Sequence, residues 1–329
     1  MILLTACQGR VVEAPATAPP VVWPPAPNEP RIAYVKSFSG PSGLGIERSL
    51  IGRLRDLVFG KQSRRLVRPM AVIATADAIF VADPGVRGVH RFDTEAGRYT
   101  LVRGPKGAPL PSPVGLTEGG SGEVYVTDSK LGRVFAIRPG EKEAEPLELG
   151  ADLVQPTGIA YDPAKQRLLV TDTMAHRIVV FDREHRLLAT IGERGDGEAE
   201  FNFPTMLWRS SRGRLYVTDS LNFRIQILDG EGDFIGAFGR QGDRVGDAPR
   251  PKGVATDRNG HLYVVDSLLH NVQIFDDAGR FLLPVGQQGQ GPGEFWLPAG
   301  IFIDRDDRIY VADSYNRRIQ VLRYLGGER

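Results

Sequence analysis

The chain has 329 residues, of which 41% are hydrophobic and 25% charged, as in an ordinary soluble globular protein. The formal net charge of +1 excludes a protein-wide field that would attract nucleic acid. No apolar run approaches the roughly 20 residues of a membrane-spanning helix, and the single cysteine, Cys7, excludes an intramolecular disulfide.

Residues 1–7 resemble the remnant of a bacterial lipoprotein signal. The string "LTAC" at 4–7 has the form of a lipobox, in which a peptidase cuts before the cysteine and the thiol is acylated. The match is incomplete, because only six residues precede Cys7 and none of them is basic. Residues 8–30 are rich in proline, which predicts an extended tether without a core of its own.

These features together predict an exported protein that is lipid-anchored in the bacterial cell envelope. Gln8 follows the cysteine, and by analogy with enteric sorting the absence of an aspartate there favours the outer membrane. The alternative is a cytosolic protein with a buried or idle thiol.

The segment at 46–59, "IERSLIGRLRDLVF", predicts an amphipathic helix. Its apolar residues fall on one helical face: Ile46, Leu50, Ile51, Leu54, Leu57 and Val58. The simplest interpretation is a helix packed against the rest of the protein. A membrane-surface helix beside the lipid anchor and a docking helix for a partner are the alternatives.

The remainder of the chain is an internal repeat. An aspartate recurs every 44 to 47 residues, at Asp83, Asp128, Asp172, Asp219, Asp266 and Asp313. A proline opens each unit: Pro69, Pro113, Pro156, Pro204, Pro251 and Pro298. Each unit contains four short strand patterns and no helix, which predicts an all-β, six-bladed β-propeller of four-stranded antiparallel blades. A linear solenoid would need atypical capping units, and none is visible.

The last unit lacks its fourth strand. The stretch "RIAYVKSFSG" at 31–40 has the character of that strand, so we expect the N-terminal strand to complete the C-terminal blade. Such closure would cover the strand edges that an open array exposes. The propeller is therefore predicted to span 31–324, followed by a short tail at 325–329.

Four of the turns share one pattern. They read "DTMAHR" (172–177), "DSLNFR" (219–224), "DSLLHN" (266–271) and "DSYNRR" (313–318). Together with the R-I-Q strands that follow, they resemble the NHL-repeat family. The resemblance is strong in units three to six and weaker in the first two. It implies a propeller, usually of six blades, which agrees with the independent count.

An arginine follows the motif aspartate by five residues in four units. The pairs are Asp128 with Arg133, Asp172 with Arg177, Asp219 with Arg224, and Asp313 with Arg318. Five residues apart across a turn, the two side chains can meet, and the carboxylate can also accept backbone N–H groups. Because one functional centre would not need four copies, we predict structural ion pairs.

The sequence does not demand catalysis. Related propeller enzymes include calcium-dependent lactonases similar to gluconolactonase and peptidyl-hydroxyglycine lyases with histidine-bound zinc, both acting at the central channel. The residues that flank the six prolines, where the channel entrance is expected, include no carboxylate, histidine or cysteine. We therefore expect no metal, no cofactor and no catalytic residue, with a channel-based lyase or lactonase as the alternative. His90 lies in a predicted third strand, and each of the five histidines is expected to be a turn or surface residue and not a metal ligand.

The residues that the repeat leaves free are the candidates for a binding face. They are the cations Arg68, Arg250 and Lys252, the aromatics Trp208 and Trp296, and the turn residues His176, Phe223, His270 and Arg317. Aromatic and cationic side chains often anchor partners, whereas Phe201 and Phe295 recur at one repeat position and are expected to pack between blades.

The favoured function is a non-catalytic scaffold that binds a protein or another envelope macromolecule through its loops and pore entrance. We expect a monomeric propeller. NHL domains that bind RNA use such a face, but an exported protein would not meet RNA, so no nucleic acid is expected. A structural role in envelope assembly is the further alternative.

Overall fold

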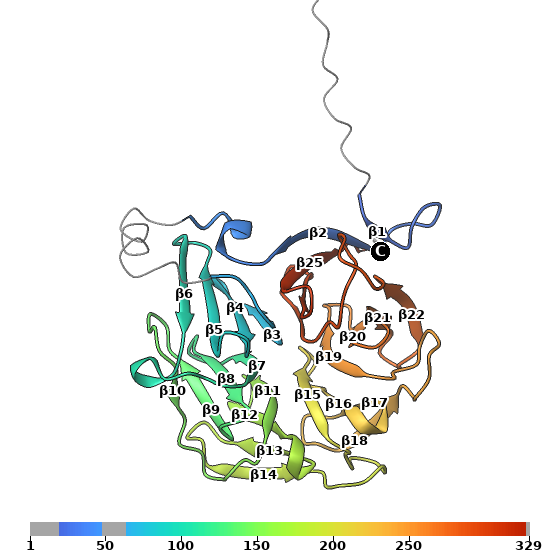
Figure 1. Cartoon of the computed structure of the whole chain (residues 1–329). Helices are drawn as coiled ribbons and strands as arrows, with labels where there is room; N and C mark the ends of the chain where they lie inside the picture. The colour runs from blue at the N-terminus through green and yellow to red at the C-terminus, as the bar shows by residue number, and fades with distance from the viewer. Residues whose placement is uncertain (1–19, 48–63, 327–329) are drawn as a thin grey trace, which may run out of the picture.

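The computed structural model describes residues 20–47 and 64–326. Within these ranges, six antiparallel sheets surround a central axis in one ring (Figure 1). The chain passes round the ring once, so that the blue strand β2 lies beside the red strand β25. The all-β, six-bladed propeller predicted from the repeat is the fold observed.

Blades 1 to 3 follow one another in chain order. Blade 1 contains β3 (Ala71–Ala74), β4 (Ala78–Asp83), β5 (Gly88–Asp93) and β6 (Arg98–Val102). Blade 2 contains β7 (Pro113–Glu118), β8 (Val124–Asp128), β9 (Arg133–Ile137) and the short β10 (Glu145–Pro146). Blade 3 contains β11 (Pro156–Asp162), β12 (Arg167–Asp172), β13 (Arg177–Phe181) and β14 (Leu187–Ile191).

Blades 4 and 5 repeat this order, and blade 6 is composite. Blade 4 contains β15 (Pro204–Arg209), β16 (Leu215–Asp219), β17 (Arg224–Leu228) and β18 (Phe234–Phe238). Blade 5 contains β19 (Pro251–Thr256), β20 (Leu262–Asp266), β21 (Asn271–Phe275) and β22 (Phe281–Val285). Blade 6 contains β23 (Ile301–Ile303), β24 (Arg308–Asp313), β25 (Arg318–Tyr324), β2 (Ile32–Phe38) and β1 (Val22–Trp23).

The helical content of the described chain is limited to 3-10 turns. They are η1 (Pro41–Leu44), η2 (Pro105–Gly107), η3 (Thr173–Ala175) and η4 (Ser220–Asn222). No helix in the described parts of the chain is long and apolar enough to cross a membrane.

The core consists of apolar layers between neighbouring blades. The second strand is buried at every position in blades 1, 2, 4 and 5, as in β20 with the sequence "LYVVD", because a blade packs on each of its faces. Phe201 and Phe295 are fully buried, and Phe201 packs with residues of blades 3 and 4. They fill the inter-blade layers, as the repeat predicted.

Glycines in the inner strands allow these strands to converge on the axis. A Cβ at Gly158 would lie 2.5 Å from the carbonyl oxygen of Thr205, and one at Gly300 would lie 2.5 Å from that of Met70. No real Cβ fits at such distances, so glycine is required where one inner strand meets the backbone of the next blade.

The ring closes as the sequence predicted. Strand β2 pairs antiparallel with β25, with Ile32 opposite Tyr324 and Phe38 opposite Ile319. Strand β1 then extends the blade to five strands. The proline-rich tether predicted for 8–30 therefore ends earlier than expected, because the side chain of Trp23 packs into the cluster that surrounds Phe295.

Two predictions lie wholly or largely outside the described residues. Cys7 with the rest of the signal remnant is one, and the helix predicted at 46–59 is the other. Ile46, at the start of that segment, is described and is buried in the cluster between blades 6 and 1.

Candidate functional site

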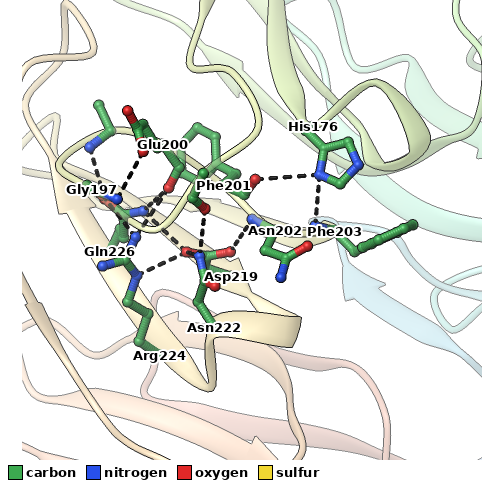
Figure 2. A network of polar contacts seen from close by, with 12 residues as sticks. His176, Gly197, Glu200, Phe201, Asn202, Phe203, Asp219, Asn222, Arg224 and Gln226 are labelled. Carbon is green, nitrogen blue, oxygen red and sulfur yellow. Dashed lines mark hydrogen bonds and ion pairs between the residues drawn. The ribbon is translucent and has the colours of Figure 1, made fainter.

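The turn motif forms a buried hydrogen-bond network, which Figure 2 shows in blade 4. Asp219 ends β16 and accepts a 2.8 Å hydrogen bond from Nε of Arg224, which opens β17. The same carboxylate oxygen accepts hydrogen bonds from Nδ2 of Asn222 at 2.8 Å and from Nε2 of Gln226 at 3.2 Å. The other oxygen accepts the backbone N–H of Asn202 at 2.7 Å. Four donor groups are thus joined through one fully buried carboxylate.

The donors of this network also hold the loop that arrives from blade 3. Arg224 donates from Nη2 to the carbonyl oxygens of Gly197 at 2.8 Å and Glu200 at 3.1 Å (Figure 2). Gln226 donates to the carbonyl oxygen of Glu200 at 2.5 Å. The arginine and glutamine of the R-I-Q strand therefore clamp the inter-blade loop to the blade.

Blade 6 repeats the clamp. Asp313 accepts Nε of Arg318 at 2.7 Å. Arg318 then donates to the carbonyl oxygens of Gly291 at 2.8 Å and Glu294 at 2.7 Å. Because these carboxylates are fully buried and already accept several donors, they are structural groups with no free oxygen to offer a ligand.

The other two predicted pairs differ from each other. Arg177 reaches Asp172 at 3.3 Å. Asp128 and Arg133 face each other across β8 and β9, but no ion pair joins these two described residues. Asp128 accepts backbone N–H groups instead, including that of Ser112 at 2.9 Å. Arg133 is exposed, where a lone ion pair stabilises little, so the predicted pair at this position is wrong.

The two turn histidines tie neighbouring blades together. His176 and His270 both have φ of 54°, the left-handed position of their turns. Nδ1 of His176 accepts the backbone N–H of Phe203 at 3.2 Å, and Nδ1 of His270 accepts that of Leu297 at 3.0 Å. Both acceptor contacts cross to the next blade, which assigns these histidines a structural role.

The six motif turns and the inter-blade loops of the described residues lie on one face of the ring, which we call the loop face. Pro204 pairs with Asp219 and Asp219 pairs with Arg224, so the start of the inner strand and the motif turn share one end of the blade. Phe238, at the end of the outer strand, lies at the same end. The loop face thus brings together Arg68, Arg250, Lys252, Trp296, His176, Phe223, His270 and Arg317.

An arc of exposed apolar side chains crosses the loop face. The second residue after the motif aspartate is Met174, Leu221, Leu268 or Tyr315 in blades 3 to 6, with exposures of 50%, 51%, 55% and 58%. We call these four residues the apolar arc. Sequence reasoning missed it, although aligning the repeats at this position would have shown an apolar residue four times in succession. Repeated exposure on one face marks an interaction surface.

The loop face also carries cations that have no counter-ion. Exposed arginines of this face that make no ion pair among the described residues include Arg68, Arg87, Arg133, Arg194, Arg244, Arg250 and Arg317. Lys252 is half-buried at the start of β19. Burial lowers the pKa of its ammonium, repulsion by Arg250 lowers it further, and Asp266 opposes both effects.

The two candidate tryptophans lie in different places. Trp296 is on the loop face, and its ring centroid lies 4.4 Å from that of Tyr315. Trp208 lies deep in the channel, where Nε1 donates to Thr256 at 3.0 Å and the ring packs edge-on against Phe302 at 5.9 Å. The expectation that Trp208 lies near the loop face is wrong, because it is the fifth residue of β15 and the strand carries it toward the opposite face.

The channel holds a cavity of about 180 Å³ that is lined by the inner strands of all six blades. Its lining combines apolar side chains such as Ile73, Leu116 and Ile301 with polar ones, and Glu118 lies at the end away from the loop face. Burial raises the pKa of Glu118, against the influence of Arg305. Within residues 20–47 and 64–326, no group of three His, Cys, Asp or Glu side chains is placed to hold a metal ion.

His90 lies in β5, a third strand as the sequence predicted, but it is fully buried and not at the surface. Its Nε2 lies 3.3 Å from Asp83 and its Nδ1 lies 2.9 Å from the hydroxyl of Tyr99. It occupies the position of the glutamines, Gln226 and Gln320, that donate to the motif aspartate in blades 4 and 6. Burial would raise the pKa of Asp83, but the bonds from His90 and the backbone of Val67 outweigh it and lower the pKa.

Two family models match parts of the chain. A family described as 6-bladed beta-propeller matches residues 254–324, and the NHL repeat matches residues 153–181. None of the curated proteins matches the chain. The NHL match covers the loop and strands around the Asp172 turn, which is one of the turns described above.

Solved structures share this fold at low identity. An auxiliary nutrient binding protein from Bacteroides thetaiotaomicron is 15% identical with a TM-score of 0.62, over 80% of this chain and 71% of that one. A catalytically inactive virginiamycin B lyase from Staphylococcus aureus, crystallised with quinupristin, is 16% identical with a TM-score of 0.58, over 80% of this chain and 97% of that one. At such identities the likeness concerns the fold alone.

Proposed function

We propose that this chain, a six-bladed β-propeller of the NHL-repeat type, is a non-catalytic scaffold that binds a protein or another macromolecule through its loop face. The apolar arc carries the proposal. Its four side chains are each at least half exposed, recur at one repeat position and lie on one face. Scattered surface apolar residues need no explanation, whereas a clustered row favours a partner that buries it.

The channel offers less support for catalysis. Its cavity is small, and the motif carboxylates are buried beneath their own hydrogen-bond donors. His90 is also inaccessible, since its side chain is fully buried. The fold does not decide between these functions, because both a nutrient binding protein and a lyase share it.

We further propose that the protein is exported and anchored in the cell envelope, in the outer membrane, through an acylated Cys7. The lipobox-like string at 4–7 and the proline-rich segment that follows it support this proposal. Mass spectrometry of the N-terminal peptide should find an acyl group on Cys7 in membrane-associated protein. An unmodified thiol in protein recovered from the soluble fraction would contradict the anchor.

The binding function is tested by replacing the apolar arc with serine. The variant combines Met174→Ser, Leu221→Ser, Leu268→Ser and Tyr315→Ser. Wild type and variant are used to capture partners from envelope extracts. Because burial of four such side chains contributes on the order of several kcal/mol, the variant should retain its partners at least tenfold more weakly.

The matched control removes apolar side chains of similar exposure from the outer rim. Leu187, Ile235 and Leu282 lie on the outer strands β14, β18 and β22 and are 49%, 47% and 49% exposed. Their serine variant should capture the same partners as wild type. Substitutions at such exposed sites change stability little, so both variants should fold. Equal capture by the arc variant and wild type would refute the proposal.

A further inference from the structure

The chemistry of the loop face defines the kind of partner. We propose that it binds an acidic polypeptide segment, with one carboxylate of that segment entering the channel mouth beside Arg250 and Lys252 and apolar side chains of the segment packing on Leu268 and Tyr315. This inference rests on the proposed function, since it assumes that the loop face is a binding surface. To that function the inference adds the charge of the partner, its chemical class and the position of the contact on the loop face.

Lys252 needs a counter-charge that the protein does not provide. Its side chain is half-buried and makes no ion pair or hydrogen bond among the described residues. The neighbouring Asp266 is fully buried and accepts the backbone N–H groups of Arg250 at 2.9 Å, Leu268 at 2.8 Å and Leu269 at 2.9 Å. A partly desolvated cation beside a second cation is stabilised by an external carboxylate.

The distribution of charge over the face points the same way. The loop that precedes blade 6 has no exposed acidic residue, whereas exposed carboxylates occur in the described parts of the loops before blades 1, 3, 4 and 5: Glu47, Glu148, Asp152, Glu193, Asp196, Glu198 and Asp243. Arg250 and Lys252 flank Pro251, where the inner strand β19 begins at the channel mouth. The unpaired Arg317 and Arg68 follow in blades 6 and 1. A segment lying over the channel mouth between blades 5 and 6 therefore meets Arg250, Lys252 and Arg317, which complement a negative partner.

The shape of the site favours a peptide over a membrane surface. Leu268 projects from its turn with 55% exposure, whereas Lys252 of the same blade is recessed at the start of the inner strand. A flat bilayer resting on the apolar arc would leave the recessed ammonium without a partner, because interfacial binding matches a surface and not a hollow. A carboxylate on a protruding side chain or chain end can enter the hollow.

The residue types also argue against nucleic acid. Single-stranded nucleic acid is bound by stacking bases on aromatic faces. Three members of the apolar arc are aliphatic, and the ring of Tyr315 already packs on Trp296 with centroids 4.4 Å apart. Aliphatic side chains with adjacent cations suit a polypeptide that alternates apolar and acidic residues.

The test uses a bead-displayed library of random eight-residue peptides, made with free and with amidated C-termini. Folded wild-type protein should enrich peptides in which Asp or Glu, or the free C-terminus, lies beside Leu, Ile or Phe. The Lys252→Met and Arg250→Gln variants should bind the enriched peptides at least tenfold more weakly. The matched control is Arg323→Gln, which removes an exposed, unpaired cation at the opposite end of blade 6.

Each outcome decides the inference. Enrichment of the amidated peptides assigns the carboxylate to a side chain, and enrichment of free acids alone assigns it to a chain terminus; both support it. No enrichment, enrichment without acidic groups, or equal binding by Lys252→Met and Arg250→Gln overturns it. Binding to phosphatidylglycerol vesicles or oligonucleotides that depends on these two residues, without peptide binding, also overturns it. The proposed function survives any of these results if the apolar-arc variant still loses its partners from extracts.

Discussion

At the residue scale, the charged side chains inside the blades are held by several donors at once. Asp313 accepts a side-chain bond from Arg318 and also the backbone N–H of Trp296 at 2.8 Å. The pair with arginine follows from a spacing of five residues, so the sequence predicts it. The backbone donor lies 17 residues earlier, and its approach depends on how the inter-blade loop folds over the turn, which no local pattern encodes.

A second pair, His261 with Asp257, makes stability depend on pH. Nδ1 of His261 lies 2.7 Å from the Asp257 carboxylate, and this hydrogen bond raises the pKa of His261 despite partial burial. A raised folded-state pKa means that the stabilisation is complete below the ordinary value of 6.5 and is lost as pH rises through the folded-state value. Replacing His261 by asparagine should therefore lower the free energy of unfolding more at mildly acidic pH than at alkaline pH.

Urea unfolding of both proteins across this pH window measures the difference. The control places His261→Asn in an Asp257→Asn background, where the carboxylate partner is absent. In that background the substitution should no longer alter the pH dependence. If His261→Asn lowers the free energy of unfolding of the wild type by the same amount at every pH, the pair does not act through the charge of the histidine.

At the element scale, the inter-blade loops are fixed by the clamp. Arg318 has a side chain only 12% exposed and donates to three loop carbonyls, those of Gln290, Gly291 and Glu294. Replacing Arg318 by alanine leaves the buried Asp313 without its cation and releases the loop. We expect a loss of about 3 kcal/mol in the free energy of unfolding, the cost typical of breaking a buried pair, together with faster amide exchange in the loop at 286–298.

An exposed ion pair in the neighbouring blade provides the control for this prediction. Arg280 pairs with Asp276 at 2.6 Å, but its side chain is 83% exposed. Arg280→Ala should change stability little, since exposed pairs are screened by solvent. Similar losses in the two variants would mean that the Arg318 network does not clamp the loop.

The elements themselves were largely predictable, because strand alternation and the proline and aspartate spacing recur in each unit. The closing strand followed from the missing fourth strand of the last unit. Strand β1 was not predicted, since two residues, Val22 and Trp23, in a proline-rich stretch carry no periodicity. Its formation depends on Trp23 packing against blade 6 and Gly293, a contact between opposite ends of the chain.

The candidate site was predictable only in part, for a related reason. The sequence located the cations near the opening prolines and the residues of the turns. The sequence did not show which turn residues make structural contacts and which are exposed for a partner. In blade 5, Leu268 and Leu269 are adjacent and chemically identical, yet Leu268 is exposed while Leu269 is half-buried. Only the turn geometry decides which of the two faces solvent.

At the scale of the whole molecule, closure of the ring places the side chains of one repeat position together on a single face. Positions 47 residues apart in the sequence, such as Leu221, Leu268 and Tyr315, occupy the same place in successive blades. Exposed apolar residues at this position therefore lie on one face, beside the unpaired cations at the channel mouth. The outer strands β14, β18 and β22 face away from this surface and should take no part in binding.

Amide hydrogen exchange of the protein with and without a captured partner tests this account most directly. The account predicts protection in the four turns that carry the apolar arc, 172–177, 219–224, 266–271 and 313–318, with no change in β14, β18 and β22. Protection confined to the outer strands, with the four turns exchanging as in the free protein, would contradict it.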